Sequence, residues 1–384
     1  MPLNSPVFMD LDAGSCHSLG IGTDGSAWAW GNNADGKLGD GTTRNSFAPV
    51  RVLLGTGVTV AAVSAGGFHS LALGIDGALW AWGNNADGQL GNGSTSTVNS
   101  SIPVRVSFPA GVTVTAVSAG AFHSLALDTD GSLWAWGSDE DGQLGKPSTG
   151  FGSSVPVQLA LPAGITFTDV SAGSYHSLAV DSLGFLYAWG KNDDGQLGDG
   201  TDTSHPVPVK VAPKWAAGTT IDSVSAGAFH SVAVDSEGTA WAWGLNQSGQ
   251  LGDGTTTRRS EPVRVVRTWG PRATIASINA GRVHTVAVDS DGTAWSWGGN
   301  EDGQLGDATR NPRSEAARVA RTWPEHTTIT SLSAGGHHGV AVDSSGAGWA
   351  WGNAAFGQLG DGYTTTQTIA TAIRTGLSAT ASPL

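Results

Sequence analysis

Residues 225–252 carry the pattern that decides the fold: SAGAFHSVAVDSEGTAWAWGLNQSGQLG. The apolar positions Val232 and Val234 alternate with other residues, and Trp241 and Trp243 do the same. Such alternation is typical of β-strands, because successive side chains of a strand point to opposite faces. The Ser-Glu-Gly segment between the two runs predicts a turn. The stretch has no helical periodicity, so it predicts short strands joined by tight turns.

The same pattern recurs along the whole chain. A histidine follows Ala-Gly and two further residues in every copy, at His17, His69, His123, His176, His230, His284 and His338. The intervals between these histidines are 52, 54, 53, 54, 54 and 54 residues. Seven copies of about 54 residues therefore fill a single domain, residues 1–384, apart from a short tail at 376–384. Self-similarity at such a period indicates a repeat architecture.

Each repeat holds four β segments, so we predict an all-β, seven-bladed β-propeller, the fold made by four-stranded units repeated radially. The Trp-x-Trp pairs support this fold because residues two apart share one face of a strand. They are Trp28/Trp30, Trp80/Trp82, Trp134/Trp136, Tyr187/Trp189 (with Tyr in first place), Trp241/Trp243, Trp295/Trp297 and Trp349/Trp351. We expect these rings to pack between blades. We further expect the ring to close by pairing of N-terminal strands near 7–11 with C-terminal strands near 368–374.

Composition excludes several classes of protein. Of 384 residues, 57 are glycine, 16 are tryptophan and only 13% are charged; a chain with this much apolar surface to bury is not disordered. The net charge of −13 argues against nucleic-acid binding, since phosphate contacts need basic patches. No apolar run has the length of a membrane span, and the first residues lack signal-peptide features. We expect a cytoplasmic protein, or a secreted one whose signal has been removed.

Three segments of the repeat resemble a known family. They are Ala-Gly-x-x-His-(Ser/Thr)-x-Ala-(Leu/Val), Trp-Gly-x-Asn-x-x-Gly-Gln-Leu-Gly and Pro-Val-x-Val. Together they resemble the regulator of chromosome condensation repeat, over essentially the whole chain. The resemblance implies a seven-bladed propeller. It does not decide the function, because one fold hosts many unrelated activities.

Members of that family include a nucleotide exchange factor for a small nuclear GTPase, a plant ultraviolet-B photoreceptor and, on a related propeller, a secreted β-lactamase inhibitor. The photoreceptor resemblance implies Trp and Arg immediately before the repeated histidine. This chain keeps only Arg282 as a basic residue there and otherwise has Phe68, Phe122, Tyr175, Phe229 and Val283. The exchange-factor resemblance implies an inserted wedge and a basic tail, but the repeat spacing is even and the termini are not basic. Neither activity is predicted.

The repeated histidines are expected to be structural. A group present in every blade serves the blade, and a ring of blades holds these side chains too far apart for one metal ion, whose nitrogen ligands lie within about 2.0–2.1 Å. We expect each histidine to satisfy backbone groups of its own blade. Loops such as 84–90 and 192–200 resemble calcium loops, but turn chemistry explains their Asn, Asp and Gly. We predict no metal site and no cofactor.

Catalysis needs residues that break the repeat symmetry. The candidate catalytic residues of this kind are Cys16, Glu140, His326 and His337, and His205 and Glu325 are also asymmetric. Cys16 precedes His17, but neighbours on a strand face opposite ways, so the spacing implies no thiolate–imidazole pair. No nucleophile, base and orienting group can be assembled from spacing alone.

Three tryptophans stand outside the Trp-x-Trp pattern. Trp215, Trp269 and Trp323 lie in connections between repeats, 54 residues apart, which places them at equivalent positions on successive blades. Basic residues surround them on a chain that is otherwise acidic: Lys214, Arg267, Arg272, Arg321 and His326. Trp with Arg is the composition of interaction hot spots. The alternative is that each ring folds over the outer blade edge and is half buried.

From these observations we predict a monomeric scaffold that binds a protein or peptide partner. The preferred site is the face bearing Trp215, Trp269, Trp323, Arg267, Arg272 and Arg321. Alternate loops of an antiparallel meander fall on one face, so this face should also carry the Asp-Gly hairpins, opposite the Gly-Gln-Leu-Gly loops. A hydrolase or lyase acting on a peptide or small molecule is the alternative function. A repeat module of a larger surface protein is a third.

Overall fold

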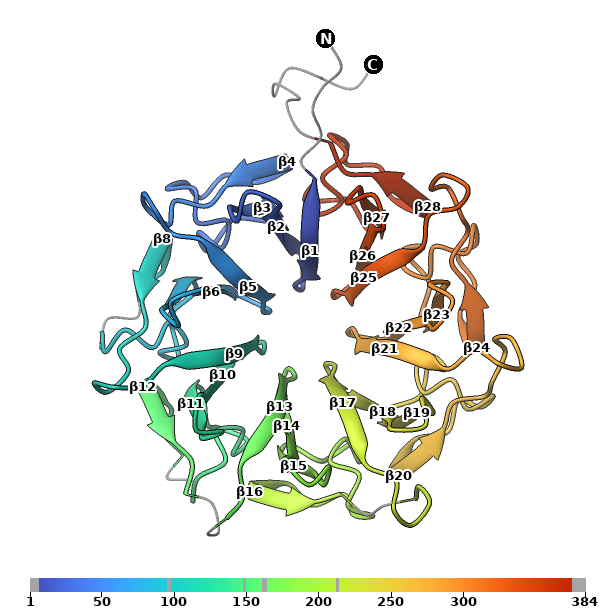
Figure 1. Ribbon diagram of the computed structural model, residues 1–384, viewed down its shortest axis with the longest axis horizontal. Coiled ribbons are helices and arrows are strands. Elements are labelled where there is room, and N and C mark those ends of the chain that lie inside the picture. The colour runs from blue at the N-terminus through green and yellow to red at the C-terminus, as the bar shows by residue number, and fades with distance from the viewer. Residues whose placement is uncertain (1–6, 95–97, 148–149, 161–163, 212–213, 375–384) are drawn as a thin grey trace.

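The computed structural model describes residues 7–94, 98–147, 150–160, 164–211 and 214–374. These residues form seven four-stranded antiparallel sheets that stand around a central axis (Figure 1). The predicted all-β, seven-bladed propeller is therefore confirmed. The tail predicted at 376–384 lies outside the described residues. Among those that are described, no helix is long and apolar enough to cross a membrane.

Each blade uses four consecutive strands, in sequence order from the axis outwards. The innermost strands are β1 (Phe8–Ala13), β5 (Val60–Ala65), β9 (Val114–Ala119), β13 (Phe167–Ala172), β17 (Ile221–Ala226), β21 (Ile275–Ala280) and β25 (Ile329–Ala334). The second strands are β2 (His17–Gly22), β6 (His69–Gly74), β10 (His123–Asp128), β14 (His176–Asp181), β18 (His230–Asp235), β22 (His284–Asp289) and β26 (His338–Asp343). The third strands are β3 (Ala27–Gly31), β7 (Leu79–Gly83), β11 (Leu133–Gly137), β15 (Leu186–Gly190), β19 (Ala240–Gly244), β23 (Ala294–Gly298) and β27 (Gly348–Gly352). The outermost strands are β4 (Ser46–Arg51), β8 (Ser100–Arg105), β12 (Ser153–Gln158), β16 (His205–Lys210), β20 (Arg259–Arg264), β24 (Arg313–Arg318) and β28 (Gln367–Ala372).

The ring closes by packing of whole blades, and the predicted pairing of N-terminal with C-terminal strands is wrong. Among the described strands, β1 pairs with β2 and β28 pairs with β27, so the two chain ends belong to different sheets. β1 lies beside β25 (Figure 1), and the Ala13 amide donates to Ser333 Oγ at 3.1 Å across the closure. The reason is that each repeat begins with its own innermost strand. The last blade therefore needs no strand from the N-terminus.

The second ring of each Trp-x-Trp pair fills the space between neighbouring blades, as predicted. Trp82, for example, is fully buried in a cluster that joins Leu19 and Ile21 of the first blade to Val60 of the second. Its indole Nε1 donates to the Lys37 carbonyl of the first blade at 2.7 Å. A large ring thus contributes apolar burial and also satisfies a carbonyl at the blade seam.

The repeated histidines also join neighbouring blades. His123 Nε2 lies 2.8 Å from Oγ of Ser177 in the next blade, and this hydroxyl donates to the Gln143 carbonyl at 2.9 Å. Because the hydroxyl proton goes to the carbonyl, the hydroxyl accepts from the imidazole and Nε2 carries the ring proton. The structural role is confirmed. The expected partner was wrong, since backbone groups of the histidine's own strand are already paired within its sheet.

The glycine of Ala-Gly-x-x-His is required at the same seam. A Cβ on Gly173 would lie 2.5 Å from the Gly227 carbonyl oxygen of the next blade and 2.8 Å from Cε1 of His176. Both distances are shorter than non-bonded carbon atoms tolerate. The glycine therefore lets blades meet backbone to backbone near the axis.

One seam lacks the hydroxyl partner. Gly339 holds the position that Ser or Thr holds in the other six repeats, and His284 Nε2 has no hydrogen bond among the described residues. Burial lowers the pKa of His284 to about 3, and it does the same for His69, His123, His176, His230 and His338. These histidines are therefore neutral at pH 7.

Candidate functional site

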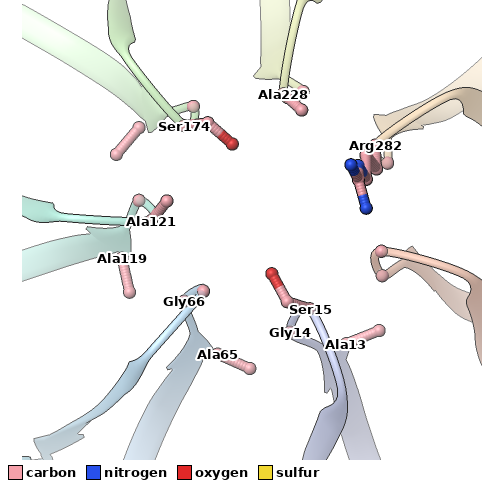
Figure 2. Close-up of a pocket in the computed structure, with 18 of the residues that line it drawn as sticks. Ala13, Gly14, Ser15, Ala65, Gly66, Ala119, Ala121, Ser174, Ala228 and Arg282 are labelled. Atoms are coloured by element: carbon pink, nitrogen blue, oxygen red, sulfur yellow. The ribbon is translucent and has the colours of Figure 1, made fainter. Parts of the chain in front are cut away.

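A cavity of about 630 Å³ opens on the propeller axis. The ends of the innermost strands and the loops that follow them line it, from all seven blades. Most of these residues are Gly, Ala or Ser, which leaves the centre open; Figure 2 shows Gly66 and Ala121 at the wall and Arg282 projecting towards the centre. The amide of Asn32 donates to the Cys16 carbonyl at 2.9 Å. The Gly-Gln-Leu-Gly loops therefore share this side, which we call the cavity face.

Four aromatic rings form a continuous row along one side of the cavity mouth. Phe68, Phe122, Tyr175 and Phe229 immediately precede the repeated histidines of the second to fifth blades. Successive ring centroids lie 5.2, 5.6 and 6.2 Å apart, with the planes tilted by 30°, 33° and 31°. We call this row the aromatic arc. Aromatic pairs at such distances attract one another, so the arc is a preformed apolar surface.

The other side of the mouth has no continuous row of rings. Here the equivalent positions hold Val283, His337 and Cys16. His337 Nε2 lies 3.2 Å from Nη1 of Arg282, and its Nδ1 lies 3.1 Å from Oδ2 of Asp302. Burial raises the pKa of the Cys16 thiol, although the charges of Lys37 and Arg282 act in the opposite direction. The mouth thus carries a continuous row of rings on one side, and on the other side charged groups together with Val283 and Phe356.

Aspartates of the Gly-Gln-Leu-Gly loops lie on the cavity face, and one of them, Asp35, lines the cavity itself. We call Asp35, Asp87, Asp141, Asp194 and Asp302 the loop aspartates, because each stands two residues before the Gln or Lys of its loop. Each faces the next blade along the chain. Asp302 of the sixth blade contacts His337 of the seventh, and Asp141 of the third lies 3.9 Å from Lys191 of the fourth.

Two lysines of the chain lie between a loop aspartate and an arc ring. Lys37 Nζ lies 3.4 Å from Asp35 Oδ2 and 5.6 Å from the centroid of Phe68. Lys191 Nζ lies 3.9 Å from Asp141 Oδ1 and 5.4 Å from the centroid of Tyr175. Both distances to the rings are within cation–π range. At two positions the mouth therefore places an ammonium group between a carboxylate and an aromatic face.

The three tryptophans between repeats pack against the blades. Their rings contact the first ring of the following pair, with centroids 5.9 Å apart for Trp215–Trp241, 6.3 Å for Trp269–Trp295 and 6.2 Å for Trp323–Trp349. Trp269 and Trp323 are each 7% exposed, and Trp215 is half-buried. This burial favours the packing interpretation, because the rings offer little surface to a partner. A role for them in partner binding stays a prediction.

The arginines beside these tryptophans form bonds within their own connections. Arg267 Nη2 donates to the Gly270 and Ala273 carbonyls at 2.8 and 2.6 Å, and Arg321 Nη2 donates to Pro324 at 2.6 Å. Arg272 is exposed and has no hydrogen bond or ion pair among the described residues. The Ile75 amide of a hairpin donates to the carbonyl of Thr59 in the preceding connection. Connections and hairpins thus share one side, as predicted, and we call it the hairpin face.

The four candidate catalytic residues are dispersed. Cys16 and His337 line the axial cavity, but no hydrogen bond joins them in the described part of the chain. Glu140 lines a second cavity of about 360 Å³ between the second and third blades. His326 is exposed on the hairpin face with a φ of 70°. Within the described residues, no group of three or more His, Cys, Asp or Glu is placed to hold a metal ion.

Sequence reasoning missed the aromatic arc as a site. Its four residues were noted only as replacements for the photoreceptor's Trp and Arg. The signal that could have found them is their position next to the buried histidine in four successive repeats. Because the loop before that histidine points to the axis, the spacing of 54, 53 and 54 residues places the four rings side by side.

Comparison with known proteins agrees with this architecture. The family model of the RCC1-like domain matches residues 2–267, and models of the regulator of chromosome condensation repeat match residues 275–304 and 291–342. This chain belongs to the RCC1-like domain family. The resemblance found in the repeat motifs is thereby confirmed.

Relatives of this RCC1-like chain differ widely in function. It is 30% identical to the ultraviolet-B receptor UVR8 of Arabidopsis thaliana over 353 residues, covering 92% of this chain and 78% of the receptor. It is 30% identical to the mitochondrial RCC1 domain-containing protein RUG3 of the same plant, covering 79% and 68%. It is 31% identical to the human E3 ubiquitin-protein ligase HERC2, covering 72% of this chain and only 6% of the ligase.

Solved structures share the fold. Human WBSCR16 superposes with a TM-score of 0.80 at 21% identity, over 91% of this chain and 93% of that one. Prp20p of Saccharomyces cerevisiae superposes with a TM-score of 0.78 at 22% identity, over 98% and 88%. At these identities the likeness concerns the propeller itself.

Proposed function

We propose that this RCC1-like propeller is a binding scaffold whose cavity face receives a protein partner. The aromatic arc carries the proposal. Its four adjacent rings form an apolar surface at the edge of a cavity, and the packing of the blades does not require that surface. The side chain of Phe68, one of the four, is 38% exposed. Aromatic residues in a concave, partly desolvated setting are the usual anchors of protein interfaces.

The relatives support a binding role. The solved structure of Prp20p accompanies its binding properties to Gsp1p and histones, and another structure shows Kap60 bound to it. Those partners belong to that protein. For this chain they support only the class of ligand, a protein. We retain a monomeric state, a cytoplasmic location (or secretion after removal of a signal) and the absence of nucleic-acid binding as parts of the proposal.

Binding is better supported than catalysis. The candidate catalytic residues fall on both faces, and the two that share a cavity, Cys16 and His337, are not hydrogen bonded to each other. His337 contacts Arg282 and Asp302 instead. A nucleophile needs a base within hydrogen-bond reach.

The test is affinity capture from native lysate of the source cells, followed by mass spectrometry. The cavity-face variant combines Phe122→Ala with Phe229→Ala. The fold should accept both changes, because equivalent positions hold Cys16, Val283 and His337. The matched control combines Ile75→Ala with Leu183→Ala, which removes apolar side chains that are 72% and 69% exposed on the hairpin face.

We expect a partner that the parent and the control retain and the cavity-face variant loses. Circular dichroism and the thermal midpoint should first show that all three proteins are folded. A partner retained equally by both variants would contradict the cavity face as the docking surface.

A further inference from the structure

The cavity face is most acidic in the second, third and fourth blades, which carry three of the four arc rings. In the second, third and fourth blades, the loops at 84–99, 138–152 and 191–204 contain eight acidic residues and two lysines. Three loop aspartates lie among them: Asp87, Asp141 and Asp194. Burial raises the pKa of each, and the charge of Glu140 adds to the effect at Asp87, whereas the charge of Lys191 opposes it at Asp141 and the charges of Arg258 and Lys191 oppose it at Asp194. Partly desolvated carboxylates of this kind are stabilised by an added cation.

Repeat symmetry pairs each loop aspartate with the residue before the next blade's histidine. Asp302 with His337 is the direct example, at 3.1 Å. Asp35 with Phe68 and Asp141 with Tyr175 each hold a lysine of the chain between carboxylate and ring. The equivalent repeat positions in the remaining arc blades are Asp87 with Phe122 and Asp194 with Phe229.

In these last two pairs the chain places no lysine at the equivalent positions, and Arg258, whose charge acts on Asp194, is itself paired with Asp202 at 2.7 Å. The positions equivalent to Lys37 are Gln89 and Gln196, whose Oε1 atoms accept from the amides of Asp87 and Asp194 in their own loops, at 2.9 Å in both cases. The positions equivalent to Lys191 are Ser138 and Leu245. Among the described residues, neither Asp87 nor Asp194 has an ion-pair partner within 4.0 Å.

We propose that the cavity face binds a basic peptide segment, whose Lys or Arg side chains enter the Asp87/Phe122 and Asp194/Phe229 pairs. The proposal deepens the proposed function and rests on it. Each site would supply a carboxylate for charge and a ring face for cation–π contact, as Asp35 and Phe68 do for Lys37.

The second cavity extends the first of these sites. Asp87, Ser138 and Glu140 line it together with Phe151, which is 78% exposed. The amide of Ser138 donates to the Phe122 carbonyl at 2.9 Å, so this cavity lies next to the arc. A segment lying across the arc would therefore find a further carboxylate and a further ring at the rim. The apolar arc and the acidic loops favour a basic chain with some apolar character over an acidic one.

The test uses fluorescence anisotropy with a fluorescein-labelled peptide of Arg-Gly-Ser repeats, a Lys-Gly-Ser analogue and a Glu-Gly-Ser control. The site variant combines Asp87→Asn with Asp194→Asn, which keeps side-chain shape. The control combines Asp130→Asn with Asp291→Asn at exposed hairpin tips, which removes the same net charge and leaves Asn-Gly turns intact. Phe122→Leu and Phe229→Leu keep an apolar side chain and remove the ring face.

We expect both basic peptides to bind and the acidic one not to bind. The site variant should weaken binding by about tenfold or more and each Phe→Leu variant by about threefold or more, while the charge-matched control stays within about twofold. Equal weakening by the site variant and the control would overturn the proposal, because it would show diffuse charge attraction.

Two other outcomes would also overturn it. If the parent binds neither basic peptide while the cavity-face variant still loses a partner in the capture experiment, the proposed function stands and the basic-peptide inference is wrong. If sedimentation shows a dimer of the parent that Asp87→Asn with Asp194→Asn dissociates, the occupant is a second copy of this chain.

Discussion

His338 Nε2 lies 2.9 Å from Oγ of Ser18, across 320 positions of the sequence. The Ser18 hydroxyl in turn donates to the Gln358 carbonyl at 2.9 Å. The same arrangement joins His123 to Ser177 inside the chain. The closing seam is therefore made of the same contacts as a seam between consecutive repeats. Side-chain contacts and isolated backbone hydrogen bonds, such as that from the Phe8 amide to the Gly346 carbonyl at 2.8 Å, hold the ring shut in place of a shared strand.

Replacing Ser18 by Ala should lower the free energy of unfolding by about 1–3 kcal/mol, the cost of leaving a buried donor without an acceptor. The change leaves the His338 Nε2–H without an acceptor and removes one of the two donors to the Gln358 carbonyl, the other being Trp30 Nε1. Urea unfolding measures the effect, with Ser107→Ala at an exposed position as control. A midpoint equal to that of the control would show that this seam contributes nothing to stability.

The seam between the sixth and seventh blades offers a matched comparison. His230 Nε2 lies 2.9 Å from Thr285 Oγ1, whereas His284 Nε2 has no hydrogen bond in the described part of the chain. Both rings are fully buried. His230→Leu should therefore cost about 1 kcal/mol more stability than His284→Leu, the typical net contribution of one hydrogen bond. Equal losses in urea unfolding would contradict this difference.

The repeat made the fold predictable. A constant interval between Ala-Gly-x-x-His motifs and a fixed order of strand-like segments leave few architectures, and the Trp-x-Trp pairs predicted where the core lies. The ring closure was not predictable, because the sequence pattern does not show at which strand a blade begins. The partner of the repeated histidines was missed for a related reason: Ser177 follows the next histidine by one residue, and only the blade seam brings it to His123.

The site was harder to predict. Hot-spot composition drew attention to Trp269 and Trp323, but a large ring in a connection packs on the nearest blade edge when it can, and both rings are buried. The aromatic arc was visible as four adjacent positions, yet its meaning depends on which loop ends meet at the axis. The contacts of Lys37 and Lys191 with carboxylate and ring span two blades. Local spacing does not reveal them.

The propeller should lose stability at pH values well above those at which most carboxylates titrate. Burial lowers the pKa of His123 and five equivalent histidines to about 3, against about 6.5 in the unfolded chain. The unfolded state then binds more protons below about pH 6.5, so stability falls as pH drops towards 3, by about 2 kcal/mol per histidine at pH 5. The raised pKa values of Asp12 and Asp169 act in the opposite direction.

Urea midpoints measured at neutral pH and at steps down to about pH 5 test this dependence. We expect a steep decline that His326→Gln leaves unchanged, since that histidine is exposed and is not one of the buried seam histidines. A flat profile over this window would show that the seam histidines are not held neutral by burial.

The tryptophans between repeats should act on stability rather than on binding. Trp269→Ala should cost about 3–5 kcal/mol, as expected for a buried aromatic ring, and Trp215→Ala should cost less because this ring is half exposed. Binding through the hairpin face needs a separate test, since loss of Trp269 can disturb the blade. Arg272→Glu combined with Arg321→Glu reverses two exposed charges while leaving the rings in place. We expect this variant to retain the captured partner. If it loses the partner while the combined Phe122→Ala and Phe229→Ala variant retains it, the binding site lies on the hairpin face.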